Sequence, residues 1–156
     1  LKIGDKNFKI VGGFAAHMYA RSGYLYQEII QQHSLEDYVS LKGVDADISE
    51  NLHKYDALIL SSTHEAFPNV IIESFNAGVV PISTNVGDVD WLINKERGIL
   101  IQGFTPDAIA ESMMKFLELD IVSRKKYIAN GRNFLRKELN EKKIFMQWME
   151  IIGNQT

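Results

Sequence analysis

The chain has 156 residues, no cysteine and a formal net charge of −3, a size that fits one domain with a substantial core. Without cysteine, disulfide scaffolds, thiolate metal sites and cysteine nucleophiles are excluded. The mildly acidic balance argues against general nucleic-acid binding. No apolar run approaches the ~18 residues that span a bilayer. The chain begins Leu1-Lys2-Ile3 with no signal-peptide pattern, and we expect it to be a piece of a longer cytoplasmic protein.

Short apolar, β-rich runs alternate with helical patterns along the chain. Strands are predicted over residues 8–11, 38–41, 57–60, 79–83 and 99–101. Helices are predicted over about 21–33, 48–54, 70–77, 88–94 and 106–119, and the tail over 123–152 is also helical. This order predicts an α/β domain with a Rossmann-like parallel sheet, helices on both faces and a helical C-terminal tail.

Several residues are expected to begin, end or weaken these helices. Thr105, Ser123 and Asn140 carry side-chain oxygens that suit helix N-caps. Gly78 follows a helical pattern and is expected to end it. Gly131 lies inside the tail helix and is predicted to be a weak point, because glycine is a poor helix former.

The positive charge is concentrated near the C-terminus. Residues 124–143 hold eight lysines and arginines against two glutamates, a local charge of +6. This pattern favours a solvated helix face. The alternative is docking to an anionic surface, either a partner domain or the headgroups at the inner face of a membrane.

The segment over residues 61–78 carries the most chemical information. It follows a predicted strand and opens a helix, so it lies at the carboxyl edge of the sheet, where open α/β folds bind ligands. Asn69 is expected to cap this helix. The amides from about Asn69 to Ile72 are then unpaired donors at the positive end of the helix dipole, and a phosphate is the natural guest.

Two carboxylates flank this helix start. Glu65 lies in the loop before the helix and Glu73 lies about one turn inside it. Carboxylates accept hydrogen bonds from vicinal sugar hydroxyls, so the pair suits a ligand with two sugars joined by a diphosphate. Glutamates are also common in loops and exposed helices, and the chemistry alone leaves both interpretations open.

At this point the sequence resembles a known family. An ordered set of motifs is similar to the signature of retaining GT-B glycosyltransferases of family 4, also called glycosyl transferases group 1. The motifs are D-A-L-I-L-S-S (56–62), E-A-F-P-N-V-I-I-E (65–73), S-F-N-A-G-V-V-P-I-S-T (74–84), N-V-G-D (85–88), R-G-I-L-I (97–101) and T-P-D-A-I-A (105–110). The resemblance covers nearly the whole chain.

The resemblance implies a fold of two Rossmann-like domains that face each other across a cleft. This chain, residues 1–156, would be the C-terminal domain, which binds the nucleotide-sugar donor. The N-terminal acceptor domain would lie outside it. So would the first strand and helix of the donor domain, which supply an arginine and a lysine to the diphosphate.

The resemblance also implies roles for particular residues. Glu65 would be catalytic, stabilising positive charge at the anomeric carbon, and Glu73 would hold the ribose hydroxyls. The remaining donor-side residues would contact the sugar, the diphosphate or the nucleobase, or line the site beside them. These residues are His64, Phe67, Pro68, Asn69, Val70, Gly43, Val44, Val86 and Gly87.

Three positions depart from the family pattern. Ala66 and Asp88 stand where glycine is usual, and Trp91 stands where an acidic residue is usual. The extra methyl group of Ala66 is the mildest possible change, but the loop that it belongs to carries Glu65.

The expected reaction is retaining transfer of a sugar from a nucleoside diphosphate to a glycan, polysaccharide or lipid-linked acceptor. The Phe67-Pro68-Asn69 variant of the motif is most similar to enzymes that use UDP-N-acetylhexosamines. No metal and no cofactor are implied, and His17, His33 and His53 have no metal-ligand spacing. We expect the chain alone to be inactive in transfer, because half of the cleft is outside it.

Other functions remain as alternatives. A nucleotide-sugar epimerase shares the GT-B fold but lacks the paired glutamates. A receiver-like regulatory module needs an aspartate at the end of a central strand, where this chain has Ser61-Ser62-Thr63. A catalytically silent nucleotide-binding domain is the third alternative.

Overall fold

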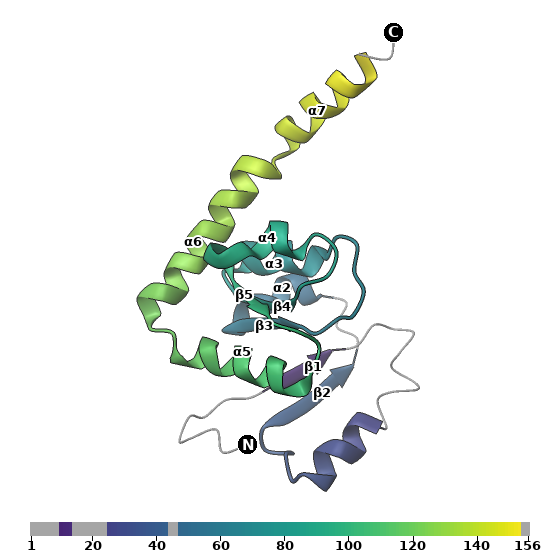
Figure 1. Ribbon diagram of the computed structural model, residues 1–156, viewed down its shortest axis with the longest axis vertical. Helices are drawn as coiled ribbons and strands as arrows, with labels where there is room; N and C mark the ends of the chain where they lie inside the picture. Colours follow the sequence, from purple (N-terminus) through teal and green to yellow (C-terminus); the bar gives the residue numbers. More distant parts are fainter. Residues whose placement is uncertain (1–9, 14–24, 44–46, 154–156) are drawn as a thin grey trace. The chain divides into compact units, whose positions relative to one another are not determined.

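The computed structural model describes residues 10–13, 25–43 and 47–153 (Figure 1). Two compact units divide the chain, Leu1–Ile48 and Ser49–Thr156. The predicted strand at 8–11 and helix at 21–33 lie partly outside the described residues, and Val44 lies wholly outside them.

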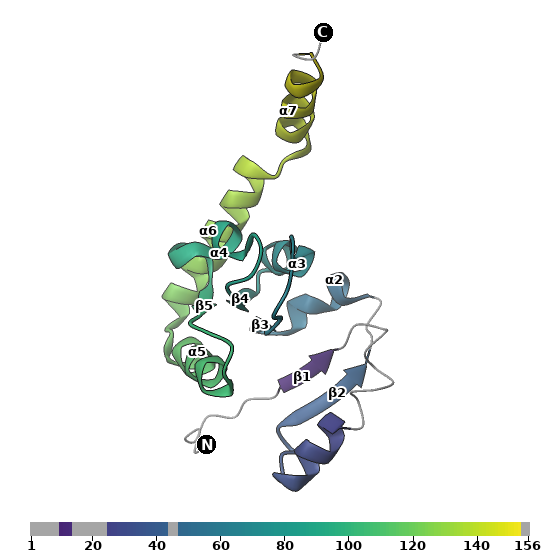
Figure 2. The ribbon, with the colours of Figure 1, turned by 45° about the vertical axis from the view of Figure 1, so that its right-hand side comes forward.

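The first unit is a parallel strand pair with a helix in the connection. β1 (Ile10–Gly13) pairs with β2 (Val39–Gly43), and the register shifts between Gly12 and Gly13. The two strands lie side by side in both ribbon views (Figure 2). Residues 25–32 are helical, and the amide of Leu35 donates to the carbonyl of Ile30 at 2.9 Å as the chain turns toward β2.

The second unit contains a three-stranded parallel sheet. Its strands are β3 (Ala57–Leu60), β4 (Val80–Thr84) and β5 (Ile99–Ile101), in that spatial order. The described residues thus contain a strand at or overlapping each of the five predicted places, and the pairs within each unit are parallel. The described strands pair in two groups, however, where the sequence predicts one sheet. Apolar runs identify strands, but they do not say which strand edges pair.

Helices alternate with these strands and continue beyond them. The helices are α2 (Ile48–Asn51), the short 3-10 turn η1 (Leu52–Lys54), α3 (Asn69–Ala77), α4 (Val89–Arg97), α5 (Pro106–Glu118), α6 (Ile121–Glu138) and α7 (Glu141–Gly153). Figure 1 shows α3 and α4 on one face of the three-stranded sheet and α5 on the other. The predicted helices on both faces and the helical tail are confirmed.

Two apolar clusters follow from this layering. On one face, Ile71 and Phe75 of α3 pack with Val89 and Leu92 of α4 and with Phe134 of α6. On the other face the buried side chains are Val80, Ile82, Ile101 and Phe116. Val80 and Ile82 share a face because side chains alternate along a strand.

The helix ends agree with the sequence at three positions and differ at one. Thr105 and Asn140 accept hydrogen bonds from backbone amides in the first turns of α5 and α7, and Gly78 ends α3 in the left-handed region with φ of 78°. Ser123 is not a cap. α6 begins two residues earlier, and Asp120 accepts the Ser123 amide at 2.7 Å.

This cap has an electrostatic reason. A carboxylate suits the positive end of a helix better than a hydroxyl does. The hydrogen bond from the Ser123 amide lowers the pKa of Asp120 below its ordinary value of 3.8.

Gly131 is a contact residue and not a weak point. α6 runs unbroken through it, and a Cβ atom at Gly131 would lie 2.3 Å from Cδ1 of Phe75. Next to it, the Arg132 guanidinium donates to the carbonyl of Phe75 at 3.2 Å and to that of Asn76 at 3.2 Å. Glycine therefore lets α6 approach α3, and Arg132 donates to backbone carbonyls in the last turn of α3.

Part of the basic stretch is used inside the protein. Arg132 binds α3, the Arg124 guanidinium lies 4.3 Å from the centroid of the Phe116 ring, and Lys143 pairs with Glu138. The exposed members are Lys125, Lys126, Arg136, Lys137 and Lys142. Within the part of the chain that the structure describes, no helix is both long and apolar enough to cross a bilayer.

The packing of Gly131 predicts the sign of a substitution. Glycine to alanine inside a helix normally stabilises a protein by up to about 1 kcal/mol. We expect Gly131→Ala to lower the free energy of unfolding by about 1–3 kcal/mol instead, because the new methyl group overlaps the Phe75 ring. Urea denaturation measures this, with the exposed Asn133→Ala on the same helix as control. Stabilisation by Gly131→Ala would contradict the described contact.

Candidate functional site

The predicted site lies where β3 and β4 end. The loop over residues 61–68 follows β3, and the loop over 85–88 follows β4. The Thr84 hydroxyl donates to the carbonyl of Ser62 at 2.6 Å, and the amide of Asp88 donates to the carbonyl of Ala66 at 3.0 Å. These bonds join the two loops, and we call this contact the loop junction.

Backbone conformation and close packing at the loop junction both favour glycine at residue 87. Its φ of 53° lies in the left-handed region, which favours glycine. A Cβ atom there would lie 2.4 Å from the carbonyl oxygen of Glu65 and 2.3 Å from that of Ala66. Val86, the preceding residue, is buried in the core with Ile71 and Phe75. The donor-side roles predicted for Val86 and Gly87 therefore fall on residues that also hold the loop of Glu65 in place.

The helix that opens the site begins one residue earlier than its predicted cap implies. Pro68 is the N-cap of α3, with extended backbone, and its side chain cannot accept a hydrogen bond. Asn69 is thus the first helical residue and not the cap. Pro68 has a ψ of 99°, outside the helical region, so the helix starts after it.

This helix start leaves backbone donors unpaired. The Ile71 amide donates to the Pro68 carbonyl at 3.1 Å. Among the residues that the structure describes, the amides of Asn69 and Val70 have no hydrogen-bond partner. Unpaired amides at the first turn of a helix form a favourable place for an anion.

The two predicted carboxylates have different surroundings. Glu65 is exposed and accepts a hydrogen bond from the Ser62 hydroxyl at 2.8 Å. Glu73 lies in the second turn of α3 and is half-buried, and its carboxylate has no ion pair or hydrogen bond within the described segments. Both carboxylates keep the capacity to accept hydrogen bonds from sugar hydroxyls.

The remaining predicted residues divide between the two units. His64 is exposed beside Thr63, with 3.0 Å between Nδ1 and the hydroxyl oxygen. Phe67 is exposed, Pro68 is buried and Val70 is half-buried. The structure brings these residues together with Glu65 at the loop junction. Gly43 ends β2 in the first unit, with φ of 72°.

Sequence reasoning missed one aromatic contact beside this site. Trp91, in the first turn of α4, lies 6.5 Å from Phe67 between ring centroids. The sequence carried a signal for it, because Trp91 departs from the family pattern. Local sequence patterns, however, do not predict that the Trp91 side chain lies beside Phe67 in the loop after β3.

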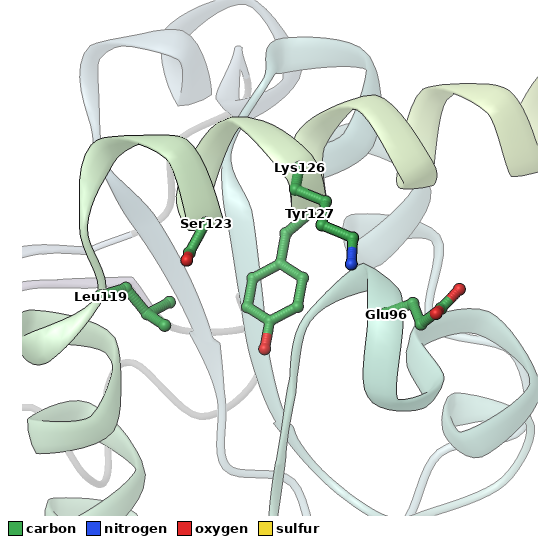
Figure 3. Close-up of a pocket in the computed structure, with 5 residues that line it drawn as sticks. All are labelled: Glu96, Leu119, Ser123, Lys126 and Tyr127. Atoms are coloured by element: carbon green, nitrogen blue, oxygen red, sulfur yellow. The ribbon is translucent and has the colours of Figure 1, made fainter.

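Two cavities lie away from the predicted site residues. One, of about 320 Å³, is lined by Glu96, Leu119, Ser123, Lys126 and Tyr127 (Figure 3). The other, of about 340 Å³, is lined by Asp90, Asn94, Glu96 and Leu100. In the described ranges, no group of three or more histidine, aspartate and glutamate side chains is placed to hold a metal ion.

Comparison with known proteins gives one family. The family model described as glycosyl transferases group 1 matches residues 5–134. The chain is 25% identical over 159 residues to the UDP-N-acetylglucosamine–peptide N-acetylglucosaminyltransferase GtfA subunit of Limosilactobacillus reuteri. That match covers 93% of this chain and 30% of the relative, so the chain spans less than a third of the relative's length.

Solved structures share the fold. A glycosyltransferase from Rickettsia africae superposes with a TM-score of 0.83 at 23% identity, over 98% of this chain and 42% of that one. Anabaena HepE, solved in complex with UDP, superposes with a TM-score of 0.81 at 20% identity, over 94% and 41% of the two chains. The α/β fold is therefore that of a GT-B glycosyltransferase domain.

The loop junction predicts a difference between two glycines. Gly87→Ala puts a methyl group against two carbonyl oxygens, whereas the nearest atom to a Cβ at Gly103 is 4.0 Å away. The φ of Gly103 is 120° and that of Gly87 is 53°, so backbone strain in the alanine variant is no smaller at Gly103, and a larger loss at Gly87 reports the clash. We expect Gly87→Ala to lower the free energy of unfolding by about 1–3 kcal/mol more than Gly103→Ala, as measured in urea. Equal losses would mean that the loops do not meet at Gly87.

Proposed function

We propose a function from one premise, that the chain belongs to the glycosyl transferases group 1 family. The chain binds a nucleoside-diphosphate sugar and is the donor-binding, C-terminal domain of a retaining GT-B glycosyltransferase. Its site consists of Glu65, Glu73 and the start of α3, with His64, Phe67 and the loop of Val86 and Gly87 beside them. The chain covers 30% of its curated relative, so the acceptor side of the cleft belongs to the rest of the protein.

The observation that carries the proposal is the start of α3. The amides of Asn69 and Val70 are unpaired among the described residues, and Pro68 leaves the helix without a side-chain cap. These donors suit the diphosphate. Glu73, one turn further along α3, accepts hydrogen bonds from the ribose hydroxyls.

Catalysis in this proposal is electrostatic. The bond from the anomeric carbon to the diphosphate oxygen breaks, and the acceptor hydroxyl oxygen bonds to that carbon on the same face. The hydroxyl proton passes to the departing diphosphate. The α3 amides offset the charge of the diphosphate, and Glu65 offsets the positive charge that develops on the sugar. We expect this arrangement to need no metal ion or other cofactor.

UDP-N-acetylhexosamine is the proposed donor. The name of the Limosilactobacillus relative includes UDP-N-acetylglucosamine, and Anabaena HepE was solved with UDP. The acceptor is a glycan, a polysaccharide or a lipid-linked sugar. We expect the 156-residue chain to bind donor without transferring it, because the acceptor side is outside the chain.

Calorimetric titration of the chain tests the proposal. We expect UDP to bind at least about tenfold more tightly than uridine, because the diphosphate meets the α3 amides. Glu73→Gln should weaken UDP binding about tenfold, since a charge-assisted hydrogen bond to ribose is lost. Glu65→Gln should weaken UDP-N-acetylglucosamine and leave UDP unchanged. Glu118→Gln, an exposed carboxylate of α5, is the matched control.

The same titration includes GDP and ADP. Tighter binding of either would keep the proposed reaction class and change the proposed base. Binding of none of the three nucleotides would contradict the proposal and favour a regulatory module.

A further inference from the structure

Two exposed aromatic rings lie beside the proposed site. Phe67 is 38% exposed and Trp91 is 48% exposed. Their ring centroids are 6.5 Å apart and their planes are inclined by 41°. We call Phe67 and Trp91 the aromatic pair. Aromatic side chains bury roughly 150–250 Å² each when they are covered, so two exposed rings side by side offer apolar surface to a ligand.

The loop junction joins the two segments that carry the aromatic pair. Phe67 follows Glu65 by two residues, directly before the buried Pro68. Trp91 follows Asp88 by three residues, and the Asp88 amide binds the Ala66 carbonyl at 3.0 Å. The aromatic pair therefore stands on the two segments that meet at the carboxyl ends of β3 and β4.

One edge of the Trp91 side chain contacts the apolar core. Its ring meets that of Phe134 at a centroid distance of 4.8 Å and an angle of 74°, an edge-on contact, and Phe134 is buried in the core. The Arg97 guanidinium lies 4.1 Å from the centroid of Phe134 and donates to the carbonyls of Trp91 and Leu92 at 2.5 and 2.7 Å. Burial holds the pKa of Arg97 below its ordinary value, although the carboxylates of Glu96 and Glu138 act in the opposite direction.

Exposed polar residues flank the aromatic pair in the sequence. Asn69 follows Phe67 by two residues, and Asp88 and Asp90 precede Trp91 by three residues and by one. The exposed apolar side chains of α7 differ, because they follow one another as a row. That row consists of Ile144, Phe145, Met146, Trp148, Met149, Ile151 and Ile152. A row of this kind suits a large apolar partner, whereas two rings among carboxylates and amides suit a small ligand with one apolar face.

A pyranose ring has this chemistry. Its axial C–H groups form an apolar face that packs on an aromatic ring, and its hydroxyl groups point outward to hydrogen-bond acceptors. We propose that the aromatic pair is a stacking surface for a pyranose ring of the substrate, with Trp91 as the principal contact. This inference rests on the proposed function and names a specificity residue for it. Because Trp91 stands where the family resemblance predicts an acidic residue, the stacking is a feature of this chain.

The two tryptophans of the chain make the proposal measurable. Trp91 and Trp148 are the only tryptophans in the sequence, so Trp148→Phe leaves Trp91 as the single fluorescent reporter. We expect UDP-N-acetylglucosamine or the methyl glycoside of N-acetylglucosamine to change the Trp91 emission, and UDP alone to leave it unchanged.

Substitutions separate stacking from nucleotide binding. We expect Trp91→Ala to weaken binding of the sugar-bearing ligand about three- to tenfold and to leave UDP affinity unchanged. Phe67→Ala should act in the same direction, and Trp91→Phe should restore most of the loss because a ring remains. Trp148→Ala, which removes a tryptophan that is 60% exposed on α7, is the matched control and should change neither affinity.

The outcomes separate the two proposals and the two sources of the sugar. A response to UDP-N-acetylglucosamine alone identifies the donor sugar, and a response to the methyl glycoside without nucleotide identifies an acceptor sugar. Either supports stacking. If UDP binds and Trp91→Ala leaves the ratio of the UDP-sugar and UDP affinities unchanged, the stacking proposal is overturned and the proposed function stands. If sugars change the emission but no nucleotide binds, stacking is supported and the proposed function fails. If no ligand binds, both fail.

Discussion

The loop junction is the contact on which the candidate site depends. Gly87 allows the segment after β4 to come against the carbonyl oxygens of Glu65 and Ala66, and no residue with a side chain fits there without displacement. The buried Val86 anchors one side of this contact in the core, and Ile71 of α3 anchors the other. One packing arrangement thus positions a carboxylate, the start of a helix and an aromatic ring. The exposed groups of the site are built on it, because loops carry function when a rigid scaffold holds them.

Much of the fold could be predicted from local patterns. All five strands and the alternating helices were readable from short apolar runs and helical spacing, and Thr105, Asn140 and Gly78 were readable as helix ends because capping is a local interaction. The errors arose where a distant or competing group decides. Helix propensity predicts a weak point at Gly131, but the residue is determined by its packing against Phe75, 56 residues away in the sequence. Asp120 caps α6 in place of Ser123, because its carboxylate carries a full negative charge at the positive end of the helix dipole.

The sequence predicts which residues form the candidate site better than it predicts the contacts that position them. The ordered motifs over residues 56–110 indicate the family, and the match over residues 5–134 confirms glycosyl transferases group 1, whereas the retaining mechanism stays a prediction. The individual roles of these residues stay predictions. Asn69 was interpreted as a cap because asparagine often is one, yet Pro68 takes that position and leaves the Asn69 amide unpaired. The contact between Phe67 and Trp91 joins the loop after β3 to the first turn of α4, and no periodicity along the chain encodes such a contact.

The central claim is that the start of α3 binds the diphosphate of a nucleotide sugar. The most direct measurement follows the backbone amide resonances of Asn69 and Val70 by nuclear magnetic resonance while UDP or uridine is added to the 156-residue chain. Both ligands carry the same base and ribose, so their difference reports the diphosphate alone. We predict that UDP moves both amide resonances strongly and that uridine leaves them in place. Resonances of Asn69 and Val70 that stay unmoved at saturating UDP would contradict the account.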